Sequence, residues 1–320
     1  GNAISTTNIA SGGHDDVYGG NGWNDAFLVK FNSAGTRLWA TYYGGSSIDE
    51  GRACAVDASG NVYLAGSTTS TSGIFFAGFQ STQNPGGFNS YTDAMLVKFN
   101  SAGVRQWGTY YGGGSPDDAF ACAVDQSGNV YIAGQTISAS NIASGGHQNT
   151  HGDGGGGTIY DAFLAKFNSN GARLWGTYYG GSSQDNGFAC ATDAVGNVYL
   201  GGQTASLSGI ASGGHQNTKA SGLSSYDGFL VKFNSSGTRQ WGTYYCGSSQ
   251  INACVTDPSN NVYAVGTTST SFGISSTGAH QTTYGGGSAD AFIVQFNSGG
   301  TRQWGTFYGG SGRDYGFGVF

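Results

Sequence analysis

Apolar and polar positions alternate with a period of two along short segments of the chain. The sequence Ala-Phe-Leu-Val-Lys-Phe at 26–31 places Phe, Val and Phe on one face and Ala, Leu and Lys on the other. Two largely apolar faces are typical of a strand buried between neighbouring sheets. In residues 105–111, Trp107 and Tyr111 share one face while Tyr110 lies on the other. This spacing, rich in aromatic and β-branched residues, predicts strands, and no segment shows a convincing helical pattern.

One unit of this pattern is predicted to hold four strands joined in two hairpins. The four segments are 52–57, 61–68, 93–99 and 105–111. Asp57-Ala58-Ser59-Gly60 predicts a tight turn, because Asp accepts backbone hydrogen bonds and Gly takes a positive φ. Asn260 stands at the Gly position in a later copy and is the best non-glycine residue there. A long polar segment, 67–92, separates the second strand from the third.

The third-strand sequence Asp-Ala-Phe-Leu-Val-Lys-Phe-Asn recurs five times, each time followed by a version of Gly-Thr-Arg-Gln-Trp-Gly-Thr-Tyr-Tyr-Gly-Gly. The copies begin at Asp25, Asp93, Asp161, Asp227 and Asp290, spaced by 68, 68, 66 and 63 residues. A repeat of this length predicts an all-β fold, a β-propeller of four-stranded antiparallel blades that pack against one another. Five blades are expected if the ring closes. A β-solenoid fits less well, because its coils repeat every roughly 20–30 residues.

The repeat makes residues 1–320 a single propeller domain. Its units start near Gly51, Ala119, Gly187 and Asn252. Residues 1–14 match 134–147, and 316–320 match the first strand of a unit, so we expect a last blade shared between 316–320 and 1–50. About ten residues that would carry the turn and the second strand of that blade are absent between the two ends. The blade therefore either has three strands or belongs to a longer repeat array, and the start at Gly1 fits a mature or excised segment.

Composition narrows the class of protein further. The 60 glycines recur at fixed repeat positions, which predicts turns and bulges. Charged residues make up 9% of the chain and the net charge is −6, so nucleic acid is an unfavourable partner. No apolar run approaches the roughly 20 residues of a membrane helix, so no membrane insertion is expected. A surface rich in Ser, Thr, Asn, Gln and Gly favours an extracellular or cell-surface location.

Three blocks that recur in fixed order resemble the bacterial SBBP (β-propeller) repeat. They are Asp-Ala-Phe-Leu-Val-Lys-Phe-Asn-Ser-x-Gly, Gly-Thr-Tyr-Tyr-Gly-Gly-Ser and Ala-Val-Asp-x-Ser-Gly-Asn-Val-Tyr-Leu-Ala-Gly. The resemblance covers essentially the whole chain. It implies a secreted or surface protein of Bacteroidetes-like bacteria, where such repeats accompany adhesion and type IX export. The family name implies seven blades, whereas this chain carries five copies.

Aspartate and histidine recur at equivalent positions and are the first candidates for chemistry. The five strand-start aspartates are predicted to accept backbone N–H groups from the long loops. Asp49, Asp117, Asp185 and Asp314 lie in Gly-Gly-Ser-x-x-Asp-type loops, where calcium binding stays an open alternative. His14, His147, His215 and His280 fall in different blades, so they are predicted to anchor loops by hydrogen bonds rather than share a metal. His151 and Asp153 occur in one copy only.

Tryptophan and cysteine also repeat. Trp39, Trp107, Trp175, Trp241 and Trp304 are predicted to pack between blades, with sugar stacking as the alternative, whereas Trp23 falls outside the repeat and is expected to be exposed. Cys54, Cys122, Cys190 and Cys254 share one strand position and are expected to be small buried hydrophobes. Cys246, eight residues before Cys254, leaves a strained bridge between these two as an alternative.

These patterns lead to a functional expectation. No phosphate-binding loop, zinc motif or serine nucleophile elbow is present, so we expect no enzyme and no catalytic, cofactor or metal residues. The leading hypothesis is an extracellular structural or adhesive propeller that contacts surface proteins through its long loops. The alternative is a lectin-like propeller with repeated, equivalent glycan sites. An open blade edge could also lead to self-association.

Overall fold

The computed structural model describes residues 1–84, 91–154, 158–222 and 225–320. The described residues form nineteen strands arranged in five sheets, one of three strands and four of four strands. Two compact units are defined by the contacts within the chain. Unit 1 comprises 1–132, 136–142 and 165–174, and unit 2 comprises 133–135, 143–164 and 175–320.

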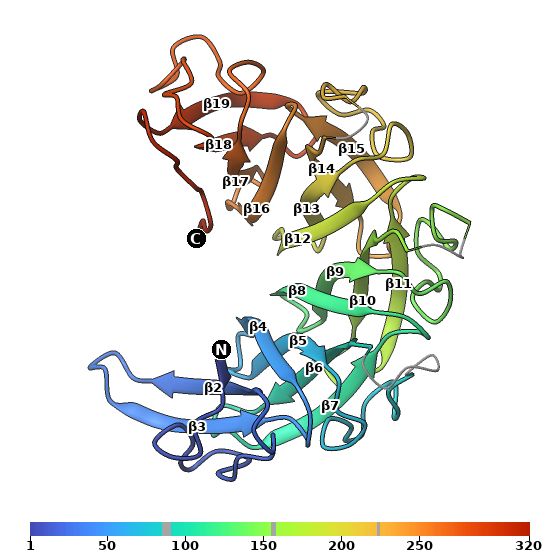
Figure 1. Cartoon of the computed structure of the whole chain (residues 1–320), viewed down its shortest axis with the longest axis vertical. Helices are drawn as coiled ribbons and strands as arrows, with labels where there is room; N and C mark the ends of the chain where they lie inside the picture. Colours follow the sequence, from blue (N-terminus) through green and yellow to red (C-terminus); the bar gives the residue numbers. More distant parts are fainter. Residues whose placement is uncertain (85–90, 155–157, 223–224) are drawn as a thin grey trace. The chain divides into compact units, whose positions relative to one another are not determined.

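Unit 1 contains two whole sheets. The three-stranded sheet has the order β1 (Asn2–Ala3), β2 (Asp25–Phe31), β3 (Arg37–Tyr43). The next sheet has the order β4 (Asp49–Val56), β5 (Val62–Thr68), β6 (Asp93–Phe99), β7 (Arg105–Tyr111), as Figure 1 shows. Neighbouring strands are antiparallel in both sheets.

Unit 2 also contains two whole sheets with antiparallel neighbours. One has the order β12 (Asp185–Thr192), β13 (Val198–Thr204), β14 (Asp227–Phe233), β15 (Arg239–Tyr245). The other has the order β16 (Ser249–Thr256), β17 (Val262–Thr268), β18 (Asp290–Phe296), β19 (Arg302–Tyr308). The remaining sheet has the order β11 (Arg173–Tyr179), β10 (Asp161–Phe167), β9 (Val130–Thr136), β8 (Asp117–Val124).

The predicted strands are confirmed, with one systematic difference in the first strand of each unit. β6 and β7 have the predicted bounds, whereas β4 begins at Asp49 instead of residue 52. The ladder continues past a β-bulge between Gly51 and Ala53, where the register shifts by one residue. Gly66 faces this bulge, and a Cβ on it would lie 1.7 Å from the Glu50 carbonyl oxygen. Bulges that need glycine on the partner strand leave little trace in hydrophobic periodicity.

The hairpin turns are as predicted. Asp57 Oδ1 accepts the backbone N–H groups of Ser59 and Asn61, both at 2.9 Å. Gly60 has φ of 77° and Asn260 has φ of 62°. The carboxylate thus holds the turn while the fourth residue supplies the left-handed conformation.

The two sheets of unit 1 pack face to face through an aromatic core. All seven residues of β6 are buried. Tyr43 on β3 meets Phe99 on β6 edge to face, with ring centroids 5.8 Å apart. Trp39 Nε1 donates to the Ser101 carbonyl oxygen at 3.1 Å, and Tyr43 donates to the Ile74 carbonyl oxygen at 2.5 Å. Each sheet therefore completes the core of its neighbour, as expected of propeller blades.

The ends of the chain bear on the expected shared blade. β1 pairs with β2, so residues at the start of the chain occupy the second-strand position of the first sheet. Residues 316–320 carry no strand assignment, so the blade shared between 316–320 and 1–50 stays a prediction. The described residues contain no helix long and apolar enough to cross a membrane.

Candidate functional sites at the sheet junctions

The strand-start aspartates are buried caps for the long loops. Asp93 and Asp161 are fully buried, and Asp93 Oδ2 accepts the Asn84 N–H at 3.1 Å while Asp161 Oδ2 accepts the Gly152 N–H at 2.7 Å. Asp227 accepts the N–H groups of two successive residues, 220 and 221, at 2.6 and 3.1 Å. Asp25 and Asp290 accept equivalent bonds. The predicted capping role is confirmed in all five copies.

The second set of aspartates closes the Gly-Gly-Ser-type loops. Asp117 Oδ2 accepts the Gly113 N–H and the Ser138 hydroxyl, both at 2.8 Å. Asp49 and Asp185 have the same partners in their own loops. Asp314 accepts the N–H of residue 310 at 2.9 Å. These carboxylates therefore also have structural partners.

The two sets of aspartates meet at the junctions between successive sheets. Asp93 begins β6 and Asp117 begins the first strand of the following sheet, 24 residues later. The Asp117 N–H donates to the Thr92 carbonyl oxygen at 2.8 Å, which fixes the two strand starts side by side. A Cβ on Gly112 would lie 2.6 Å from Asp117 Oδ2 and 2.9 Å from Asp93 Oδ1. Two buried carboxylates thus converge on one glycine.

This convergence repeats along the chain. The same geometry brings together Asp25 with Asp49 around Gly44, Asp161 with Asp185 around Gly180, and Asp290 with Asp314 around Gly309. Sequence reasoning treated the two sets separately and missed that they meet. The constant spacing of 24 residues was the available signal, but it identifies a contact only once the strand order is known.

Burial dominates the electrostatics of these carboxyl groups. Removal from water raises the pKa of Asp49 to about 6 and those of Asp93 and Asp185 to about 7. It also raises the pKa of Asp117 well above its ordinary value, and the neighbouring Asp93 charge raises it further. One oxygen of Asp93, Oδ1, has no hydrogen-bond partner among the described residues, and the same holds for Oδ1 of Asp161 and Asp290.

The junctions are numbered in chain order, and the fourth, where β14 begins at Asp227 and β16 begins at Ser249, differs in composition. Ser249 stands where the other copies have the second aspartate, and Cys246 stands where they have the glycine. The Ser249 hydroxyl accepts the Gly228 N–H at 2.9 Å and donates to the Tyr245 carbonyl oxygen at 2.7 Å. Lys219 brings its ammonium to 3.9 Å from Asp227 Oδ1, and its side chain is 1% exposed. One carboxylate and one ammonium replace two carboxylates here.

The repeated histidines pack against aromatic rings. His147 lies 6.4 Å from the Tyr179 ring and 6.1 Å from the Phe233 ring, and burial lowers its pKa. His14, His215 and His280 make equivalent ring contacts. The expected hydrogen-bonded anchor is thus a ring contact instead, because the neighbouring outer strand presents tyrosine. No three metal-ligating His, Cys, Asp or Glu side chains cluster in the described part of the chain.

His151 is the exception among the histidines. Its Nδ1 lies 2.7 Å from Asp153 Oδ1, and its Nε2 lies 4.0 Å from Asp161 Oδ1. The imidazole is buried against the third junction. This irregular pair, found in one copy of the sequence, therefore borders a carboxylate pair.

The tryptophans and cysteines are structural. Four tryptophans at the repeated position are buried, and their Nε1 atoms donate to serine carbonyl oxygens of the following hairpin: Trp39, Trp107, Trp175 and Trp241. Trp304 is half-buried and Trp23 is exposed. All five cysteines are free, so the Cys246–Cys254 alternative is wrong, and Cys246 Sγ donates to the Phe272 carbonyl oxygen at 3.0 Å. Of the four cysteines expected to be buried, Cys254 is buried, Cys122 and Cys190 are half-buried, and Cys54 is exposed, so the expectation is confirmed for Cys254 alone.

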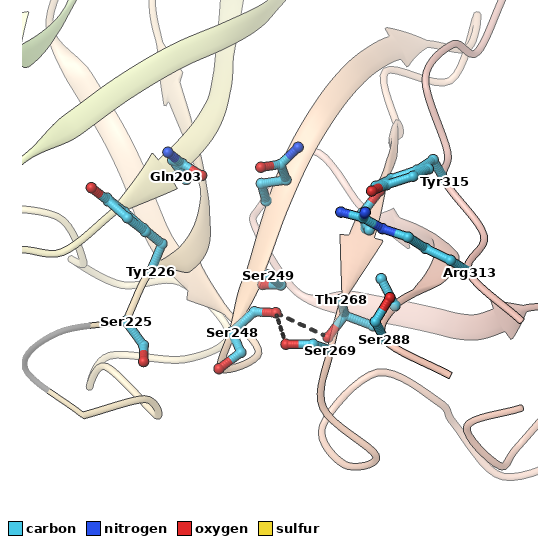
Figure 2. Close-up of a pocket in the computed structure, with 13 residues that line it drawn as sticks. Gln203, Ser225, Tyr226, Ser248, Ser249, Thr268, Ser269, Ser288, Arg313 and Tyr315 are labelled. Atoms are coloured by element: carbon cyan, nitrogen blue, oxygen red, sulfur yellow. Dashed lines mark hydrogen bonds between the residues drawn. The ribbon is translucent and has the colours of Figure 1, made fainter. Parts of the chain in front are cut away.

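A polar cavity of about 370 Å³ lies in unit 2 beside the fourth junction. Figure 2 shows Gln203 and Tyr226 on one side and Arg313 and Tyr315 on the other. The Arg313 guanidinium lies over the Tyr315 ring, 4.6 Å from its centroid. Between them, the carbonyl oxygen of Ser248 accepts the hydroxyls of residues 268 and 269. Hydroxyl, amide and tyrosine groups in this arrangement can bind a polar, uncharged or anionic ligand.

The sheet architecture defines a β-propeller repeat protein. Residues 38–74 and 106–142 match the family model described as SBBP, Beta-propeller repeat. The chain thus carries repeats of the SBBP β-propeller family, as the sequence resemblance implied.

Two curated proteins show partial similarity. Regulatory protein FlaEY of Caulobacter vibrioides is 28% identical over 170 residues, which covers 52% of this chain and 17% of that protein. Uncharacterized WD repeat-containing protein L264 of Acanthamoeba polyphaga mimivirus is 24% identical over 262 residues, which covers 71% of this chain and 19% of that protein. The chain thus spans less than a fifth of the length of either relative.

Solved structures show a distant likeness. A protein of unknown function from Bacteroides caccae aligns with a TM-score of 0.42 at 10% identity, covering 92% of this chain and 81% of that one. A gluconolactonase from Xanthomonas campestris aligns with a TM-score of 0.40 at 10% identity, covering 90% and 71% respectively.

Proposed function

We propose that the chain is a non-catalytic, extracellular β-propeller module that makes structural or adhesive contacts with surface proteins. One observation carries this proposal: the polar side chains that recur in every unit hold the blades together. Strand-start aspartates hold the long loops, and tryptophan N–H groups hold the following hairpin. Arginines such as Arg173 donate to loop carbonyl oxygens. A repeated catalytic role would need such groups to be available to a substrate.

Ligand recognition then falls to residues that differ between units. The cavity in Figure 2 contains Tyr226, Arg313 and Tyr315, which do not belong to the third- and fourth-strand repeats. Its position at the ends of β13 and β17 places it among the loops, where propellers and other rigid scaffolds commonly present their binding groups.

A glycan is the second candidate ligand, favoured by the lining of this cavity. Hydroxyl and amide groups can exchange hydrogen bonds with sugar hydroxyls, and a tyrosine face can stack on a sugar ring. The burial of four repeated tryptophans argues against the version with equivalent tryptophan sites in every blade. The glycan candidate is therefore one site, the cavity in unit 2, rather than equivalent sites in every blade.

Binding of the immobilised chain to panels of surface proteins and glycans tests both candidates. Capture of surface proteins that survives deglycosylation supports the leading proposal. Glycan capture that is lost in Arg313→Ala or Tyr315→Ala supports the glycan site if it is kept in the control Lys30→Ala, a charged residue outside the cavity. Turnover of a substrate by the purified chain would contradict a non-catalytic module.

A further inference from the structure

The carboxylate pairs at the sheet junctions are poorly neutralised. Asp93 and Asp117 are fully buried and adjacent to each other, and the described residues form no ion pair with either. Asp93 Oδ2 accepts hydrogen bonds from the Asn84 N–H and the Gln80 side-chain amide. Asp93 Oδ1 is buried, has no hydrogen-bond partner among the residues that the structure describes, and faces Gly112 beside Asp117. Burying like charges together is costly unless a positive charge or a proton compensates.

The fourth junction shows what such a site accepts when one carboxylate is missing. Lys219 Nζ donates to Ser221 Oγ at 2.6 Å, to the Gly222 carbonyl oxygen at 2.8 Å and to the Ser225 carbonyl oxygen at 2.6 Å. Asp227 Oδ1 lies 3.9 Å away. A single positive charge in a cage of hydroxyl, carbonyl and carboxylate oxygens thus accompanies a single buried carboxylate.

The third junction has a basic side chain of its own. The His151 ring lies against Asp161, and its other nitrogen contacts Asp153. Where a junction carries an additional titratable base, that base comes from the same long loop that leads into the strand-start aspartate. The first, second and fifth junctions carry two aspartates and no such base among the described residues.

We propose that the carboxylate pairs Asp25–Asp49, Asp93–Asp117 and Asp290–Asp314 each bind a calcium ion. At the first two pairs the ion holds two successive sheets together, and at the third it holds the segment after β19 against the start of β18. Charge matching supports a divalent ion. At the fourth junction one ammonium balances one carboxylate, so a pair of carboxylates requires two positive charges. All candidate donors are oxygens, which suit a hard cation, and water or loop carbonyl oxygens complete its coordination. Calcium tolerates irregular geometry, whereas magnesium demands a near-ideal octahedron.

Calorimetric titration of chelator-treated chain with CaCl2 tests the proposal directly. We expect calcium binding and a rise of several degrees in the midpoint of thermal unfolding, because a ligand of the folded state stabilises it. NaCl at matched ionic strength should not reproduce the rise. Absence of calcium binding, or an equal response to NaCl, would overturn the proposal.

Variants locate the sites. The double variant Asp93→Asn, Asp117→Asn should bind one calcium ion fewer per chain, whereas Asp16→Asn, which removes an exposed carboxylate, should bind the same number. Unchanged stoichiometry in the double variant would overturn the assignment.

Hydrogen exchange of the unmodified chain gives an independent readout should the double variant fail to fold. The amide protons of Asn84 and Gly113 donate to the paired carboxylates. Calcium should slow their exchange more than that of the Ala220 amide at the lysine-containing junction. Equal effects at the two junctions, or none, would contradict calcium binding at the pair.

Discussion

The second and fourth junctions share one backbone hydrogen bond between strand starts but carry different charges. Asp117 donates its N–H to the Thr92 carbonyl oxygen at 2.8 Å, and Ser249 donates its N–H to the Tyr226 carbonyl oxygen at 3.0 Å. The second carboxylate is therefore not needed to place the strand starts side by side. A neutral hydroxyl serves in the fourth junction, and there Lys219 balances the remaining aspartate.

A glycine occupies the position beside the strand-start aspartate at every junction that has the second carboxylate. A Cβ on Gly112 would press on Asp117 Oδ2 at 2.6 Å, so only glycine fits beside two carboxylates. In the fourth junction the second carboxylate is absent and Cys246 occupies this position with φ of 58°. Gly112 does not have a positive φ, so crowding by the two carboxylates, rather than backbone conformation, accounts for the glycine.

The largest expected difference between the two junctions is in their response to pH. Burial raises the folded-state pKa of Asp93 to about 7, above its unfolded value near 4. A raised pKa contributes stability that is present below the unfolded pKa and lost as the pH rises through the folded pKa. In the presence of a chelator we therefore expect the free energy of unfolding to fall between about pH 4 and pH 7, by up to about 1.4 kcal/mol per pH unit for each such carboxyl, and to level off above pH 7.

Urea unfolding at several pH values checks this expectation. Asp93→Asn should flatten the slope, whereas Ser249→Ala should leave it unchanged. Calcium should restore stability at pH 8 if the carboxylate pairs bind it. A stability that rises with pH in the presence of a chelator would contradict the raised pKa values of the carboxylate pairs.

Lys219→Met should have the next largest effect. The variant keeps most of the side-chain volume but leaves Asp227, which is fully buried, without its ammonium. Removing one partner of a buried pair costs roughly 3 kcal/mol. Urea unfolding measures the loss, and Lys30→Met is the matched control, at a half-buried lysine that forms no ion pair within the described part of the chain. A loss as small as that of the control would show that Asp227 does not need the ammonium.

Gly112→Ala should destabilise the chain by about 2 kcal/mol, since its Cβ would displace buried carboxylates in a packed interior. The comparison variant is Cys246→Ala, which keeps a Cβ at the equivalent position and loses the thiol contacts with the Phe272 carbonyl oxygen and the Thr268 hydroxyl. Thermal unfolding of both variants measures the difference. Equal losses would mean that crowding by the second carboxylate does not explain the glycine.

Local rules made most of the blade predictable from the sequence. The period-two pattern set β6 and β7 at their observed bounds, and the Asp and Gly of the turn at 57–60 identified the first hairpin. The start of β4 was missed because the bulge at Gly51 is set by the partner strand. Hydrophobic periodicity describes one strand at a time, so it contains no information about an extra residue that a bulge places in one of two paired strands.

The candidate sites were less accessible from the sequence. The capping role of Asp93 followed from its position before a strand, because side-chain to backbone hydrogen bonds are local. Its contact with Asp117 joins two successive sheets and follows only from their packing. The ring contacts of His147 are likewise tertiary. The oxygen cage around Lys219 is local, since Ser221, Gly222 and Ser225 supply it, but it depends on an irregular loop conformation that the sequence pattern does not indicate.

The smallest effect is expected from Ser249→Ala at the fourth junction. The variant removes the hydroxyl that accepts the Gly228 N–H and donates to the Tyr245 carbonyl oxygen, so two buried backbone groups lose a partner. The cost should be about 1 kcal/mol. Ser59→Ala is the control, because a later copy of the same turn has Val195 at that position. A loss well above that of Gly112→Ala would mean that the hydroxyl, rather than the Lys219–Asp227 pair, holds this junction together.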